Sequence, residues 1–238
     1  MINIPIKDHS NLPMHILENP VWQALSTRDS RFNKGDQVVK YFSSAVSPFL
    51  GMDSWEVENQ HILLQSMPKE RSFSVMIQDK INFIDQFEVV FTTPLYQMVC
   101  NKLNPALKVG KKFIALDLNN VPEMLTLTAL TKPGPFLSET INFGNYIGIF
   151  DEENLVSMAG ERLHAENFTE ISAVCTDPEY LGKGLAAHLL SEAAIRVIED
   201  GFTPFLHVRA DNTRAIAMYE RLGFEKRTEM YFAVFKMK

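Results

Sequence analysis

The chain has 238 residues, of which 46% are hydrophobic and 22% charged, so its composition is that of an ordinary globular protein. A net charge of −6 argues against nucleic acid as the main partner, because phosphate binding requires a basic surface. No apolar run reaches the length of a membrane span, and residues 1–9 lack the basic and apolar regions of a signal peptide. We therefore expect a cytoplasmic protein with neither a nucleic-acid nor a membrane partner.

The first part of the chain predicts a modest α/β unit whose role the sequence does not show. Its expected elements are a surface arm over residues 1–20, a short apolar piece at 21–25, a helix over 36–44, a turn at 47–51, strands at 73–77 and 87–91, and a helix or a strand at 95–101. A proline, a glycine and nearby lysines interrupt the pattern at residues 103–110. We therefore expect an N-terminal α/β portion over residues 1–105 and a second domain over residues 106–238.

The second part has a clearer pattern. Its expected elements are a strand at 113–116, a helix at 119–130, a loop at 131–136, a helical turn at 138–142, strands at 145–150 and 155–163, a central strand at 171–175, a helix from about 185 to 201, a strand at 205–208, a helix at 213–222 and a strand at 230–235. Apolar residues at helical spacing from Leu185 to Val197 predict that their helix covers one face of a sheet.

Cysteine and histidine give no sign of a metal or a thiol nucleophile. Cys100 and Cys175 both follow apolar residues, which predicts buried free thiols. The six histidines never pair at a metal-ligand spacing, so we expect no metal.

Residues 171–187 predict a strand, a turn, a loop with Gly182 and Gly184, and then a helix. Glycines let backbone N–H groups converge, and the first turn of a helix offers unpaired donors at the positive end of its dipole. Lys183 adds a positive charge, so the loop can hold an anion, although two glycines can also serve a plain turn. Two nucleotide-binding patterns do not match, because Lys183 precedes Gly184 and Ala187 stands where a third glycine is required.

Two strings carry a family resemblance: V-C-T-D-P-E-Y-L-G-K-G-L-A at residues 174–186 and P-F-L-H-V-R-A-D-N-T-R-A-I-A-M-Y-E-R-L-G-F at 204–224. Together they resemble the GNAT superfamily of acyl-CoA-dependent N-acyltransferases, from about residue 111 to the end of the chain. The resemblance implies an α/β (α+β) fold with a mixed, mostly antiparallel sheet, splayed central strands and flanking helices. It also implies an N-acetyltransferase that uses acetyl-CoA and moves an acetyl or short acyl group to a primary amine by direct attack in a ternary complex.

The resemblance assigns cofactor contacts residue by residue. The backbone of the central strand would pair with the pantetheine arm, and the family's loop pattern [RQ]-x-x-G-x-[GA] would hold the pyrophosphate. Asn212 would touch the arm or order its groove, or only cap its helix, and Tyr219 would point at the thiolate or pack in the core. Leu181 departs from the Arg or Gln of the pattern. The implied cofactor-binding residues are Val174, Cys175, Thr176, Leu181, Gly182, Lys183, Gly184, Leu185, Ala186, Asn212 and Tyr219.

The base that deprotonates the amine is less well defined. Some family members carry a glutamate on the strand beside the central one, where this chain has Glu161; Glu170 is a second candidate, and water a third. Tyr219 is expected to act as the acid, because a phenol can donate to a departing thiolate.

The acceptor is open at this stage, as is the oligomeric state. In the resembled family, residues 131–143 would lie over a small-molecule or peptide amine. Acidic residues gather along one region of the sequence, which predicts an acidic acceptor mouth that favours cationic amines: Asp151, Glu152, Glu153, Glu161, Glu166 and Glu170. The alternative to an enzyme is a catalytically silent CoA-binding module with a regulatory or interaction role.

Overall fold

A computed structural model describes residues 15–107 and 109–238 of the chain. Most of the expected N-terminal arm, residues 1–14, lies outside the described residues. The helices and strands are α1 (Pro20–Ser26), β1 (Val39–Tyr41), β2 (Leu50–Met52), α2 (Val57–Ser66), β3 (Phe73–Ile77), β4 (Phe87–Val99), β5 (Ile114–Ala115), α3 (Val121–Thr131), β6 (Ile147–Asp151), β7 (Asn154–Ala165), β8 (Phe168–Thr176), α4 (Leu185–Glu199), β9 (Thr203–Arg209), α5 (Thr213–Arg221) and β10 (Glu225–Met237).

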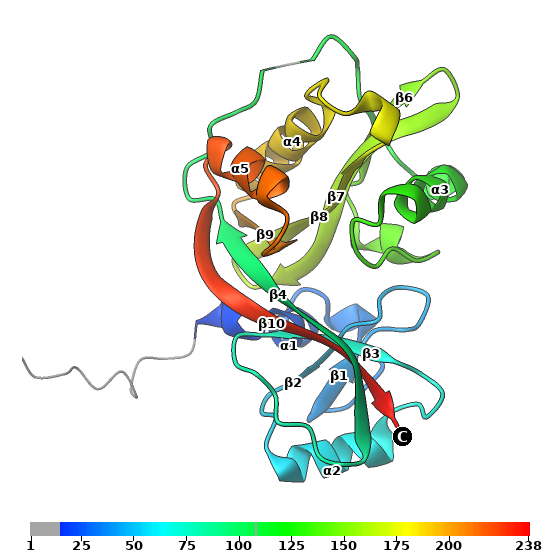
Figure 1. Cartoon of the computed structure of the whole chain (residues 1–238), viewed down its shortest axis with the longest axis vertical. Coiled ribbons are helices and arrows are strands. Elements are labelled where there is room, and N and C mark those ends of the chain that lie inside the picture. The colour runs from blue at the N-terminus through cyan, green and yellow to red at the C-terminus, as the bar shows by residue number, and fades with distance from the viewer. Residues whose placement is uncertain (1–14, 108) are drawn as a thin grey trace, which may run out of the picture.

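One eight-stranded sheet organises the chain, in the order β3-β10-β4-β9-β8-β7-β6-β5. Each neighbouring pair is antiparallel except β8 and β9, which are parallel. Helix α3 packs on one face of β7 and β8, and α4 packs on the other face with its predicted apolar stripe (Figure 1). The expected α/β fold with a mixed, mostly antiparallel sheet is confirmed.

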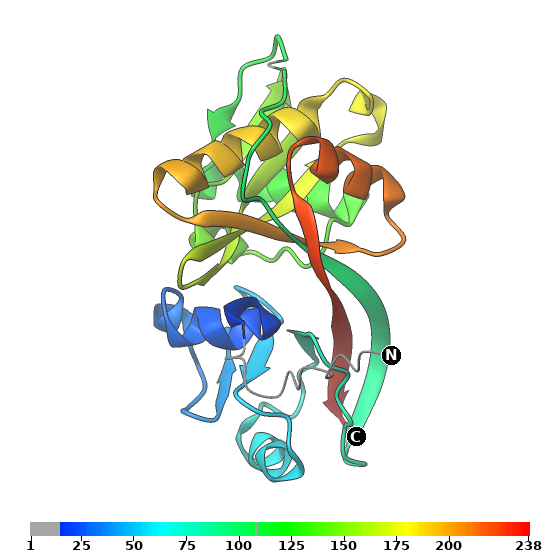
Figure 2. The same cartoon turned by 90° about the vertical axis from the view of Figure 1, so that its left-hand side faces the viewer.

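Strands β4 and β10 connect the two ends of the molecule. Both are 13 residues long, pair with each other along almost their whole length, and run from the part with α4 and α5 down to the part with α1 and α2 (Figures 1 and 2). Strand β3 joins the far edge of the same sheet, while β1 and β2 form a separate two-stranded sheet. The main sheet therefore continues across residue 105, and the division into two domains stays a prediction.

Two local expectations in the first part change. The helix predicted over residues 36–44 is wrong: β1 lies there, because the Asp36 carboxylate accepts hydrogen bonds from the backbone N–H groups of Val38 and Val39 and closes a turn instead. The ambiguous stretch 95–101 is largely the second half of β4, which pairs with β9 and β10.

The parallel pair β8–β9 is short, and its shortness creates space in the sheet. The two strands pair only between Phe168–Glu170 and Thr203–Phe205. Beyond these residues they diverge, and α5 follows β9 after a turn of three residues. In residues 15–107 and 109–238, no helix is both long and apolar enough to cross a membrane.

Candidate active site

The glycine loop before α4 has the geometry of an anion cradle. Gly182 (φ 81°) and Gly184 (φ 77°) both adopt left-handed conformations, which glycine reaches without the steric cost of a Cβ atom. Gly184 is the N-cap of α4, and no described side chain caps the helix. The N–H groups of the first turn are therefore free donors at the positive end of a 15-residue helix.

A β-bulge interrupts the central strand beside this loop. Ser172 pairs with Gly160 and Cys175 with Met158, so two residues of β8 oppose one residue of β7. Within the bulge, Ala173 has a φ of 53°, which is uncommon for a residue with a side chain. Beyond Glu170, the described part of the chain offers β8 no strand partner on the β9 side. The backbone from residue 174 to 176 is therefore available to a ligand on that side.

The loop, β8 and α5 surround a cavity of about 370 Å³, which we call the loop pocket. Of the eleven predicted cofactor residues, all but Lys183 line it. The Lys183 ammonium lies 4.1 Å from the centroid of the Tyr180 ring instead. The structure thus brings the two predicted strings of the sequence around one pocket; their roles in binding stay predictions.

A second cavity of about 420 Å³, the aromatic pocket, lies on the other side of the same strand ends. Its walls come from segments that are far apart in the sequence, including residues before 105. Five residues line both pockets, so the two cavities meet there: Val174, Cys175, Thr176, Asn212 and Tyr219. The loop at 131–135 also lines the aromatic pocket, at the place where the acceptor was expected.

Tyr219 stands at this junction. It lies on α5, is 8% exposed, and burial raises its pKa to about 12. Its hydroxyl is not among the enclosed polar atoms without a partner, so it opens into the pockets that it lines. A phenol with a raised pKa stays protonated at neutral pH and can donate a hydrogen bond.

Asn212 fits both of the roles left open by the sequence. Its side-chain oxygen accepts a hydrogen bond from the backbone N–H of Ala215 at 3.2 Å, which caps α5. The same residue lines both pockets.

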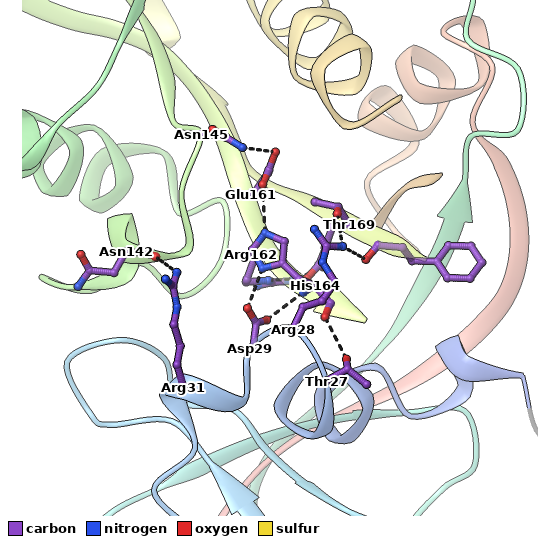
Figure 3. Close-up of polar contacts among 12 residues, drawn as sticks. Thr27, Arg28, Asp29, Arg31, Asn142, Asn145, Glu161, Arg162, His164 and Thr169 are labelled. Atoms are coloured by element: carbon purple, nitrogen blue, oxygen red, sulfur yellow. Dashed lines mark hydrogen bonds and ion pairs between the residues drawn. The ribbon is translucent and has the colours of Figure 1, made fainter. Parts of the chain in front are cut away.

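Glu161 lies elsewhere. It is 5% exposed, and neither pocket includes it in its lining. Its carboxylate accepts a hydrogen bond from the Asn145 side chain at 2.9 Å and contacts Nε2 of His164 at 3.0 Å, while Asp29 contacts the other ring nitrogen at 2.7 Å (Figure 3). Burial alone lowers the pKa of His164, but its two carboxylate partners raise it to about 9. Both oxygens of Glu161 are thus engaged in a network that ties the N-terminal part to β7, and the structure gives its proposed role as base no support.

Glu170, the second candidate base, is fully enclosed by partners. Both of its oxygens accept hydrogen bonds from Arg162, at 2.8 and 2.5 Å, and one contacts Nδ1 of His207 at 2.7 Å. Burial raises the pKa of Glu170, but Arg162 and His207 lower it to about 2. A carboxylate held ionised in this way is a poor proton acceptor.

The expected acidic acceptor mouth is not what the structure contains. No Asp or Glu belongs to the described lining of the aromatic pocket, whereas Lys132, Arg162 and Arg209 do. Asp151 pairs with Lys111 at 2.5 Å, and the carboxylates of Glu161 and Glu170 are buried in the contacts above. Sequence proximity was a poor guide, because strand side chains alternate between faces and loops turn away.

Three comparisons bear on the family. The model of the FR47-like protein family matches residues 146–233. A solved protein of Novosphingobium aromaticivorans DSM 12444, assigned to the GNAT acetyltransferase family, superposes with a TM-score of 0.87 at 30% identity; the match covers 94% of this chain and 100% of that one. The chain therefore belongs to the GNAT family.

Curated relatives match only its C-terminal part. A mycothiol acetyltransferase of Mycolicibacterium gilvum is 37% identical over 84 residues, 32% of this chain and 28% of the relative. The [ribosomal protein bS18]-alanine N-acetyltransferase of Escherichia coli is 42% identical over 59 residues, 23% of this chain and 38% of the relative. The chain thus spans well under half of the length of either protein.

Proposed function

We propose that the protein is an N-acetyltransferase that moves an acetyl group from acetyl-CoA to a primary amine. The observation that carries the proposal is the junction of the two pockets: the loop pocket ends in an uncapped helix N-terminus, the aromatic pocket enters from the opposite side, and Tyr219 lies where they meet. The names of both curated relatives and of the solved family member agree with this class of activity.

In this proposal the backbone N–H groups of the glycine loop and the first turn of α4 bind the pyrophosphate, and residues 174–176 align the pantetheine arm. Acetyl-CoA supplies the thioester. The amine, held in the aromatic pocket, attacks the carbonyl carbon, so that an N–C bond forms, the C–S bond breaks and the amine loses a proton to water. Tyr219 donates a hydrogen bond to the sulfur as negative charge develops on it.

The high pKa of Tyr219 decides how it acts. A thiol has an ordinary pKa near 8.5, so a phenol with a pKa of about 12 keeps most of its own proton. Hydrogen bonding to the thiolate therefore contributes more than complete proton transfer.

The test is a binding measurement followed by a turnover measurement. Calorimetry with CoA should show binding, and incubation with acetyl-CoA and a panel of primary amines should release free thiol together with an acetylated amine detected by mass spectrometry. CoA binding without any acetylated product would favour the alternative, a silent CoA-binding module. Absence of CoA binding would overturn both.

A further inference from the structure

The aromatic pocket has the features of a site for an anionic acceptor. On the basis of the function proposed above, we propose that the acceptor is a small primary amine that also carries a carboxylate and an apolar side chain, and that Arg162 binds the carboxylate. This inference reverses the cationic acceptor expected from the run of acidic residues in the sequence.

Arg162 is a buried guanidinium with one edge free. Its Nε and Nη2 atoms donate to Glu170, and the only ring packed on it is Phe49 among the described aromatic residues, 4.9 Å from Cζ to the ring centroid. In residues 15–107 and 109–238 no acceptor is found for Nη1. That atom is also absent from the enclosed polar atoms without a partner, which are Oε2 of Glu123 and the hydroxyl of Tyr146 in the described chain. Since Arg162 lines the aromatic pocket, Nη1 opens into it.

A guanidinium has five N–H donors in a rigid plane. Glu170 uses the edge formed by Nε and Nη2, which leaves the edge formed by Nη1 and Nη2 for a second carboxylate in a two-point contact. The orientation of this edge is held from behind: Nδ1 of His207 contacts Glu170 at 2.7 Å, and the Gln97 side chain contacts Nε2 of His207 at 3.0 Å. Because the donor is already fixed, little conformational entropy is lost when an anion binds.

Charge favours a carboxylate over a doubly charged phosphate. Glu170 offsets the charge of Arg162, and Asp211 pairs with Arg209 at 2.6 Å. Lys132 lines the pocket and has no ion pair within the described chain. The groups around the pocket therefore leave about one net positive charge, which matches one carboxylate.

The rest of the pocket is apolar and aromatic. Phe91 and Phe232 form a T-shaped pair with centroids 6.4 Å apart, and Phe91 remains 47% exposed. A ligand side chain that covers these rings removes apolar surface from water. The pocket thus combines an oxyanion contact with an apolar contact, in addition to the reacting end at Tyr219.

The experiment compares acceptors that differ in the carboxylate alone. L-phenylalanine and 2-phenylethylamine are assayed with acetyl-CoA on the wild-type protein, Arg162→Lys, Lys132→Gln and the control Lys69→Gln. Arg162→Lys keeps a cation beside Glu170 but removes the free edge, and Lys132 is exposed, so its loss leaves the fold intact. Lys69 is an exposed lysine outside the pocket.

We expect wild-type kcat/KM to be at least about tenfold higher for L-phenylalanine than for 2-phenylethylamine, because charge-assisted hydrogen bonds are about twice as strong as neutral ones. Arg162→Lys should lower kcat/KM for L-phenylalanine about tenfold and Lys132→Gln by a smaller factor, with little change for 2-phenylethylamine. Lys69→Gln should change neither.

Equal or faster turnover of 2-phenylethylamine would overturn the inference and leave the proposed function standing, since acetyl transfer would still occur. So would a preference for O-phosphoethanolamine. If neither phenyl acceptor is acetylated, calorimetric titration of L-phenylalanine into the CoA-loaded protein decides: binding that Arg162→Lys weakens supports the inference, and no binding overturns it. CoA affinity, measured separately, reports on the proposed function.

Discussion

The two pockets are built in opposite ways. The loop pocket draws its lining from two short segments, residues 174–187 and 212–221, whereas the aromatic pocket gathers residues from Phe49 to Phe232. The first relies on backbone N–H groups and a helix terminus, and the second on side-chain charges and rings. A site made of local backbone can be recognised in a sequence, but a site made of distant side chains exists only once the sheet has formed.

This difference means that single substitutions should affect one pocket without the other, except where the pockets meet.

Tyr219→Phe removes only a hydroxyl from the junction and should have the largest effect. Because the hydroxyl is expected to stabilise charge that grows as the thiolate leaves, turnover should fall by about ten- to a thousandfold. CoA affinity and the melting temperature should change little, since the ring and its packing remain. Unchanged turnover, measured where the chemical step limits the rate, would reduce Tyr219 to a core residue.

The contact between His164 and Asp29 holds the N-terminal wall of the aromatic pocket against β7. Its pKa of about 9 in the folded protein exceeds the ordinary value of 6.5, so its stabilising contribution is full below about pH 6.5 and is lost as pH rises through 9. We expect this group to make the protein about 2 kcal/mol less stable at pH 8.5 than at pH 6. Urea unfolding at the two pH values measures the difference.

The control for this experiment is a pair of variants. His164→Gln should lose this part of the pH dependence, while His61→Gln, which changes an exposed histidine, should keep it. The same pH dependence in His164→Gln and the wild type would contradict a buried imidazolium.

Gly184→Val tests the loop pocket alone. A β-branched residue at a φ of 77° is strained by about 1–2 kcal/mol, and its Cβ would meet Val109 at 3.4 Å and stand beside the pyrophosphate. CoA affinity should fall about tenfold, as measured by calorimetry. Gly201→Val is the matched control, because Gly201 has a φ of 85° just after the other end of α4 and lines neither pocket. Equal CoA affinity in Gly184→Val and the wild type would falsify the assigned loop.

Phe91→Ala tests the aromatic pocket alone and should have the smallest effect. Phe91 is half exposed, so its truncation costs little stability, but the acceptor loses an apolar contact and its KM should rise about threefold, with the KM for acetyl-CoA unchanged. Val90→Ala is the control, because the neighbouring residue of β4 points to the opposite face and is absent from the pocket lining. A rise in the acetyl-CoA KM instead would break the separation of the two pockets.

Much of the fold followed from local pattern. The helices at 185–201 and 213–222 and the strands at 73–77 and 171–175 were predicted within a few residues, because apolar periodicity and glycine or asparagine caps act over a few positions. Residues 36–44 were misassigned, since the Asp36 turn competes locally with a helix that has no cap of its own.

The candidate site divides along the same line. The glycine loop, Asn212 and Tyr219 could be found in the sequence because each lies in a short string with a strand-loop-helix context. Arg162, Lys132, Phe91 and the bulge at Ala173 could not, because none belongs to a pattern. Glu161 looked available on its strand, yet its partner His164 and, through it, Asp29 engage it in the folded protein.

The sequence by itself therefore determined the order of the elements and the loop that can hold an anion, since both depend on backbone conformation set by neighbouring residues. Only the tertiary structure decided the charge of the second pocket. Whether a charge faces a cavity or a partner depends on which strands pair and where they diverge: Glu170 turns inward to Arg162 and His207, while the free edge of Arg162 faces the pocket beside rings contributed by β4 and β10.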